Sequence, residues 1–236
     1  MHMRRIIFIS TLCLLLICML ISCDGMQGLV GDMLETAEEG GVLDSLFEKV
    51  DMETVKSEIN ASRTEDFEET DDATNYVRIR VRDHGDIVIK LCPAAAPETV
   101  LNFKKLVHEG FYDGMVFHRI IQNFMIQGGG YDQSGAQKET DTIKGEFENN
   151  GVKNELQHVR GVISMARTTV PDSATSQFFI CDATSDYLDG QYAAFGYVVA
   201  GMETVDSIAA VRTGSMDWPL EDVVIESATF VKPIKE

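Results

Sequence analysis

The chain has 236 residues, of which 44% are hydrophobic and 25% are charged, and its formal net charge is −18. This composition is ordinary for a globular protein and excludes a wholly disordered chain. The excess of acidic residues, with no clustered run of Lys or Arg, argues against a protein that binds the phosphates of nucleic acid.

The first 22 residues have the pattern of an export signal. Arg4 and Arg5 precede an apolar run from Ile6 to Ser22, which stops at Cys23, and a charged region followed by an apolar one is typical of secretory signals. The sequence LISC before and at Cys23 resembles the bacterial lipobox. This resemblance implies that Cys23 is acylated, becomes the mature N-terminus and anchors the protein to the membrane. An uncleaved transmembrane anchor or a soluble secreted form are the alternatives, and all three export the chain.

Few cysteines remain after such a signal is removed. The mature chain would keep Cys23, Cys92 and Cys181, which is too few for a disulfide framework. We expect Cys92 and Cys181 to be unpaired and mostly buried.

Residues 23–75 form an acidic segment. From residue 24 to residue 75 there are sixteen Asp and Glu against three Lys and Arg. The stretch TEDFEETDDAT is too acidic and too poor in apolar residues to pack. We interpret the segment as a largely disordered tether, with a partner-binding helix as the alternative. A short amphipathic helix within it is indicated by five apolar residues at helical spacing: Val42, Leu43, Leu46, Phe47 and Val50.

Residues 76–236 are expected to form one domain. YVRIRVR, starting at Tyr76, alternates apolar and basic residues as a half-buried strand does, with its arginines on the outer face. Pro97 and Gly110 bound one predicted helix, and a second lies between Met202 and Gly214. The other predicted strands cover residues 87–91, 116–120, 123–127, 161–166, 177–181, 194–199 and 223–231. Eight strands and two helices favour a mainly β fold, a closed eight-stranded antiparallel β-barrel capped by two α-helices, because closure removes exposed strand edges.

The stretch FHRIIQNFMIQGGG, which starts at Phe117, places an arginine among large apolar residues. If its two apolar segments are neighbouring strands, a period of two puts Arg119 on one face with Phe117, and Gln127 on one face with Met125. The pattern alone allows Arg119 to be a surface charge. We interpret His118 as a packed imidazole, because no nucleophile and orienting Asp stand around it in a recognisable arrangement. The glycines lack the spacing of a dinucleotide-binding loop.

Four segments, FHRIIQNFMIQGG, GVISMAR, SQFFI and LDGQYAAFG, follow one another in this order. Together they resemble the cyclophilin family of peptidyl-prolyl cis/trans isomerases, from about Tyr76 to the C-terminus. The resemblance implies a barrel capped by two helices, with no metal and no cofactor. It also implies that Arg119 is the catalytic arginine and that Gln127 orients Arg119 and the substrate backbone. The implied substrate-lining residues are Phe124, Met125, Ala166, Arg167, Gln177, Phe179, Tyr187, Leu188 and Tyr192.

The chemistry of the reaction explains the need for an arginine. An X-Pro bond resists rotation by about 18–20 kcal/mol because the nitrogen lone pair is delocalised into the carbonyl. Twisting the bond localises the lone pair, to which a guanidinium can then donate, and arginine stays charged at any working pH.

The implied partners are proline-containing peptides and unfolded exported proteins. The protein is expected to act as a monomer, lipid-anchored through Cys23 at the extracytoplasmic face of the cell membrane. A proline-peptide binding module or holdase with little turnover, and a structural envelope lipoprotein, are the alternative functions. Tyr187 stands where cyclophilins often have Trp, and Tyr192 stands where they have a pocket His, so the resemblance implies weak binding of cyclosporin.

Overall fold

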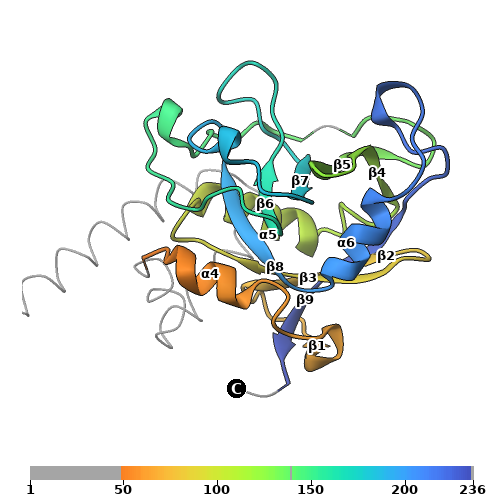
Figure 1. Cartoon of the computed structure of the whole chain (residues 1–236), viewed down its shortest axis with the longest axis horizontal. Coiled ribbons are helices and arrows are strands. Elements are labelled where there is room, and N and C mark those ends of the chain that lie inside the picture. The colour runs from red at the N-terminus through yellow and green to blue at the C-terminus, as the bar shows by residue number, and fades with distance from the viewer. Residues whose placement is uncertain (1–48, 139, 235–236) are drawn as a thin grey trace, which may run out of the picture. The chain divides into compact units, whose positions relative to one another are not determined.

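A nine-stranded antiparallel sheet dominates the part of the chain that the computed structural model describes, residues 49–138 and 140–234 (Figure 1). These residues all fall in one of the two units into which the chain divides, Leu46–Glu236. The predicted signal with Cys23, and the apolar residues from Val42 to Phe47, lie outside the described residues. The strands are β1 (Phe67–Glu69), β2 (Tyr76–Val81), β3 (Gly85–Leu91), β4 (Met115–Ile121), β5 (Met125–Asp132), β6 (Val162–Met165), β7 (Phe178–Cys181), β8 (Ala194–Ala200) and β9 (Ile225–Pro233).

Three α-helices accompany the sheet in the described residues: α4 (Met52–Glu58), α5 (Pro97–His108) and α6 (Met202–Ala209). Short 3₁₀ turns are η1 (Thr64–Asp66), η2 (Glu148–Asn150), η3 (Asp186–Leu188) and η4 (Ser215–Asp217). Helix α5 begins at Pro97, where the missing N–H of proline costs no hydrogen bond. Within residues 49–138 and 140–234, no helix is both long and apolar enough to cross a bilayer. The same residues contain no disulfide, and Cys181 is buried.

The mainly β fold and its antiparallel pairing are confirmed, and β2 to β9 lie where the sequence predicted strands. Closure into a barrel is not confirmed, because the order of paired strands, β1-β9-β2-β3-β8-β6-β7-β5-β4, has two ends. One edge of β4 pairs with β5, and its other edge is joined to the residues just before β9. An isolated bridge joins Val116 to Val224, and the N–H of Phe117 donates to the carbonyl of Val223 over 2.9 Å.

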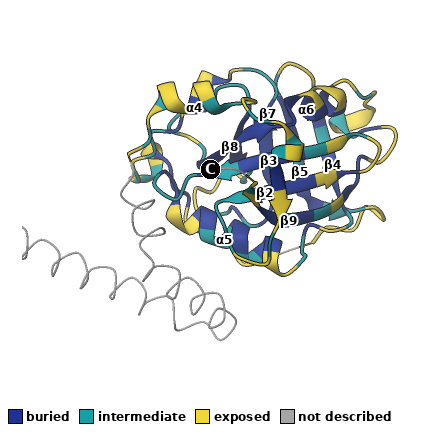
Figure 2. Cartoon of the chain, turned by 90° about the horizontal axis from the view of Figure 1, so that it is seen from below, coloured by how far each residue is buried: buried dark blue, intermediate teal, exposed yellow. Residues whose placement is uncertain are grey.

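The main core lies on one face of the sheet, together with the apolar faces of α5 and α6. Phe103 of α5 is fully buried at its centre. Its ring centroid lies 5.2 Å from Tyr112, 5.8 Å from Phe178 and 5.2 Å from Phe195. Figure 2 shows that the strands are mostly buried and that exposed residues gather in the loops and on the outer side of the helices.

Residues 51–69 pack on the outer face of the sheet and differ from the predicted tether. Helix α4 buries Val55, and β1 pairs with β9 and buries Phe67. Both side chains belong to a second apolar cluster, which includes Tyr197 and Val199 of β8. We call residues 51–69 the N-terminal strap. The folded unit therefore starts before Tyr76. A ninth strand was not expected there, and the short amphipathic helix was expected at residues 42–50, whereas α4 covers Met52–Glu58.

Charge explains why an acidic segment packs here. Arg78 of β2, predicted to face solvent, is 9% exposed, and its Nη2 donates to the carbonyls of Thr64 (2.9 Å) and Phe67 (2.8 Å). In the same way, Glu58 of α4 accepts from Lys90 over 2.7 Å. The acidic strap is thus the counterpart of a basic sheet face, so its composition does not imply that it is solvated throughout.

Candidate active site

Strand register aligns the predicted catalytic residues on one face of the sheet. Arg119 of β4 lies opposite Gln127 of β5, and Gln127 lies opposite Phe179 of β7. Directly opposite residues share a face, so the three side chains form one row. Met125 and Cys181 are opposite each other two residues further along, and they extend the same face by a second row.

A β-bulge places Arg119 on this face. The register of β4 against β5 shifts on both sides of Phe117, and Phe117 is fully buried in the main core. The prediction that Phe117 and Arg119 share a face was therefore wrong, because a bulge adds one residue and interrupts the period of two. His118 also reaches the side of Gln127, with 3.4 Å between His118 Nε2 and Gln127 Nε2.

Most of the apolar residues that were predicted to line the substrate gather beside Arg119 and Gln127, in a cluster separate from the main core. This outer apolar cluster consists of Met125, Phe179, Cys181 and Leu188, with Ile121, Phe124, Ala166 and Tyr192 packed against it. The ring of Phe179 meets that of Tyr192 edge-on at 5.8 Å. Tyr187, at the rim, is 59% exposed, and its ring lies 5.9 Å from that of Phe124. The structure thus brings together six of the nine predicted lining residues and leaves Tyr187 open to solvent.

Arg167 supports the rim of this cluster. Its Nε and Nη2 donate to the carbonyl of Gln191 over 3.1 and 2.8 Å. Its guanidinium carbon lies 4.6 Å from the ring centroid of Tyr192 and 4.9 Å from that of Phe147, within the range of a cation–π contact. The charge of Arg167 is therefore already used to hold the loop that carries Tyr192.

The two glutamines of the site bind each other. Gln127 Nε2 donates to Gln177 Oε1 over 3.0 Å. The side chain of Gln177 lies over Gly130, where an added Cβ would be 2.5 Å from the Gln177 amide carbon. Glycine at this position is thus required for the close approach of Gln177. The resemblance implied that Gln127 orients Arg119, but the ionic contact of Arg119 is with Asp217, over 3.4 Å between Nε and Oδ2.

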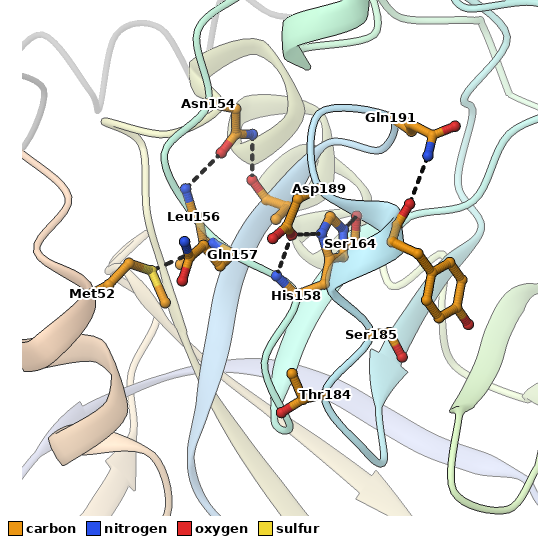
Figure 3. Close-up of polar contacts among 12 residues, drawn as sticks. Met52, Asn154, Leu156, Gln157, His158, Ser164, Thr184, Ser185, Asp189 and Gln191 are labelled. Carbon is orange, nitrogen blue, oxygen red and sulfur yellow. Dashed lines mark hydrogen bonds and ion pairs between the residues drawn. The ribbon is translucent and has the colours of Figure 1, made fainter.

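Figure 3 shows a polar network formed by His158, Asp189 and Ser164. His158 Nδ1 is 2.8 Å from Asp189 Oδ1, and His158 Nε2 is 3.0 Å from Ser164 Oγ. The imidazole stacks against Phe179 at 6.0 Å. Burial lowers the pKa of His158, opposed by its hydrogen bond with Asp189. The neutral ring therefore donates from Nδ1 and accepts at Nε2.

Ser164, His158 and Asp189 are hydrogen-bonded in the order of a hydrolytic triad. Unlike the nucleophile and the base of such a triad, Ser164 and His158 are not accessible to a substrate. His158 is 1% exposed and Ser164 is 0% exposed, so no substrate can reach the hydroxyl. The network instead fixes the turn η3, because Asp189 follows Leu188 directly. The network links Asp189, the residue after Leu188, to Ser164 of β6, and its imidazole stacks on Phe179.

His118 is packed rather than catalytic, as expected from the sequence. It is 6% exposed, and its ring lies 4.7 Å from Tyr131 and 5.8 Å from Trp218. Burial lowers its pKa to about 4. His118 is therefore neutral at ordinary pH and adds no charge beside Arg119.

Sequence reasoning missed several residues of this surface. Ile121 and Cys181 could have been found by counting in twos from Arg119 and Phe179. Asp217 could not, because nothing local connects it to β4. A cavity of about 630 Å³ lies elsewhere, between the N-terminal strap and the sheet, and none of the predicted site residues lines it. In the described residues, no group of His, Cys, Asp and Glu could hold a metal ion.

Comparison with known proteins shows the family of the chain. The family model described as "Cyclophilin type peptidyl-prolyl cis-trans isomerase/CLD" matches residues 76–230. Peptidyl-prolyl cis-trans isomerase B of Escherichia coli is 49% identical over 160 residues, which cover 62% of this chain and 94% of that protein. Peptidyl-prolyl cis-trans isomerase A of Dickeya dadantii is 45% identical over 158 residues, covering 63% of this chain and 80% of that protein.

A solved structure shows the same fold. The cyclophilin-type isomerase of Cryptosporidium parvum, crystallised in the presence of the dipeptide Ala-Pro, superposes with a TM-score of 0.57 at 28% identity. The match covers 66% of this chain and 98% of that one. The chain described here belongs to the family of cyclophilin-type peptidyl-prolyl cis-trans isomerases.

Proposed function

We propose that Arg119 and Gln127 catalyse cis/trans isomerisation of X-Pro bonds in exported proteins, while the outer apolar cluster holds the proline ring. The observation that carries this proposal is the row of Arg119, Gln127 and Phe179 on one face of the sheet. It sets a permanent positive charge beside an apolar surface. No metal, nucleotide or covalent step is needed, because the reaction is a rotation.

The row suits the transition state better than the ground state. In the planar bond the proline nitrogen is a poor hydrogen-bond acceptor. It becomes a good acceptor only as the bond twists, because the lone pair is then localised on the nitrogen. The guanidinium of Arg119, 40% exposed, is open enough to donate to it. Gln127, already fixed by Gln177, offers its amide oxygen to the peptide backbone. Interactions that strengthen only in the twisted state raise the turnover number, and a thousandfold acceleration needs about 4 kcal/mol.

The test is a protease-coupled assay with an Ala-Pro peptide on the chain from residue 24 onward. Arg119→Ala is expected to lower kcat/KM at least about a hundredfold, or about 2.7 kcal/mol, with little change in peptide affinity. Arg119→Lys keeps the charge but not the planar guanidinium. Its kcat/KM is expected to lie between those of the wild type and Arg119→Ala. Arg63→Ala, which removes a 78% exposed arginine just before η1, is the matched control.

The same assay separates the alternative function. A proline-peptide binding module or holdase would bind the peptide on the same apolar cluster but would show little turnover. Peptide binding without measurable turnover by the wild-type protein would therefore support the binding module and contradict the enzyme.

The proposed site of action is the extracytoplasmic face of the membrane, with the protein lipid-anchored through Cys23 and acting as a monomer. The sequence pattern of residues 4–23 supports this part of the proposal. Cys23→Ser is expected to move the protein out of the membrane fraction or to leave an uncleaved precursor, with isomerase activity unchanged. Unaltered fractionation together with a product of mature length would contradict the lipid anchor.

A further inference from the structure

Arg119 has an acidic neighbour that comes from a distant part of the chain. Asp217, at the end of η4, places Oδ2 3.4 Å from Arg119 Nε, and the two side chains are 44% and 40% exposed. Both charges are therefore partly hydrated and still close enough to act on a bound peptide. Gln127, the neighbour of Arg119 across the strands, makes its hydrogen bond with Gln177 instead.

The loop that carries Asp217 is held firmly. Trp218 packs its ring against His118 of β4 and Tyr131 of β5, at 5.8 and 5.4 Å. The N–H of Gly214 donates to the carbonyl of Trp218 over 2.7 Å and closes the loop. The position of Asp217 beside the sheet is thus set by packing of the residue that follows it.

The backbone of the loop is unusual at the carboxylate itself. Met216 and Asp217 have φ values of 58° and 60°, in the left-handed region that non-glycine residues seldom adopt. Such conformations persist where surrounding contacts determine them, and they gather at functional sites. Met216 is 85% exposed, so its packing does not explain the conformation, whereas the contacts of Asp217 and Trp218 do.

We propose that Asp217 determines the charge specificity of this site, by disfavouring acidic residues that flank the proline of a bound peptide. This inference rests on the proposed function, since it concerns the peptide that Arg119 acts on. Without Asp217, the guanidinium would attract acidic flanking residues into poorly placed complexes. With Asp217, the two charges nearly cancel at a distance, and a flanking carboxylate meets a like charge. The neighbouring His118, with a pKa of about 4, is neutral at ordinary pH and adds no positive charge to this pair.

The test uses two sets of three Ala-Pro peptides. In one set Lys, Gln or Glu precedes the Ala-Pro pair, and in the other set it follows the pair. Because the charges of Arg119 and Asp217 nearly cancel, the wild-type protein is expected to turn over the Lys and Glu peptides with similar kcat/KM. Its Lys-to-Glu ratio is expected to be about three- to fivefold higher than that of Asp217→Asn, the effect of one unit charge about 7 Å from the flanking residue in a hydrated site. Asp217→Asn keeps an oxygen and a residue that tolerates the left-handed region. It is expected to bring the Lys-to-Glu ratio below one, because Arg119 is then uncompensated.

Control measurements separate charge from structure. Trp218 is the only tryptophan of the chain, so its emission reports whether the loop keeps its place in Asp217→Asn. Glu68→Gln removes the same charge from β1, which lies apart from β4 in Figure 1, and is expected to leave the ratio unchanged. High salt is expected to reduce the difference in this ratio between the wild type and Asp217→Asn.

Two outcomes are decisive. A Lys-to-Glu ratio that is the same in the wild type and Asp217→Asn at both flanks, with Trp218 emission unchanged, would overturn the inference. Failure of the wild type to turn over any of the peptides would instead refute the proposed function, and the dissociation constants of the same peptides would then still test whether Asp217 sets the charge preference.

Discussion

Replacing His118 is expected to flatten the dependence of stability on pH. Burial lowers the pKa of His118 from 6.5 to about 4, because a charged imidazole packed against Tyr131 and Trp218 loses its hydration. The unfolded chain therefore binds the proton more tightly than the folded one. It follows that the stabilising effect of neutral His118 is present above about pH 6.5 and is lost as the pH falls towards 4.

The difference between the two pKa values sets the size of the effect. Each unit of difference in pKa is worth about 1.4 kcal/mol. The free energy of unfolding is therefore expected to fall by about 3 kcal/mol well below pH 4 and by about 2 kcal/mol at pH 5. His118 Nδ1 has no hydrogen-bond partner among the described residues, so replacing the imidazole by an apolar ring removes the 3.4 Å contact of Nε2 with Gln127 but no hydrogen bond of Nδ1. His118→Phe keeps a ring of similar size, and His118→Gln is a second variant that does not titrate.

The measurement is urea unfolding of the three proteins at about pH 7.5 and about pH 5, followed by circular dichroism. The wild type is expected to lose about 2 kcal/mol more of its free energy of unfolding over this range than either variant. His158, whose pKa burial also lowers, is present in all three proteins and cancels in the comparison. An equal loss in all three would show that His118 is hydrated or already protonated in the folded protein, and would refute the reasoning.

Three further predictions concern the strap, the buried network and the rim. Limited proteolysis is expected to leave a core that starts near residue 51, and removal of residues 1–74 is expected to lower the free energy of unfolding by about 2–4 kcal/mol, because Arg78 loses two carbonyl acceptors and apolar surface is exposed; a stable fragment starting at residue 76 would contradict this. Asp189→Ala is expected to cost about 2–4 kcal/mol in urea unfolding and to lower kcat/KM, whereas Ser164→Ala costs about 1 kcal/mol; equal stability of both variants would show that the network does not fix η3. Tyr187→Trp is expected to strengthen inhibition by cyclosporin about tenfold with little change in peptide turnover, because an indole N–H replaces the differently placed hydroxyl; an unchanged inhibition constant would show that Tyr187 is not at the rim that cyclosporin contacts.

The sequence by itself determined the strands and most of the apolar site. Alternation of apolar and basic residues located β2, and short apolar segments bounded by turn residues located most of the strands from β3 to β9. The residues that pack as the outer apolar cluster, such as Phe179 and Leu188, lie in short segments that resemble one family. Resemblance of several segments in one order carries their arrangement with it, which is why Met125, from β5, was expected beside them.

Only the tertiary structure decided the features that depend on contacts between distant segments. The bulge at Phe117 reverses the face that counting in twos assigns, because one extra residue shifts every later side chain. The strap was predicted to be disordered because the composition of a segment carries no information about the surface on which it packs. Phe67 and its acidic neighbours pack on an apolar and basic surface that the rest of the sheet provides. Asp217 reaches Arg119 because Trp218 packs on β4 and β5, and no local pattern records a contact between residues so far apart in the chain.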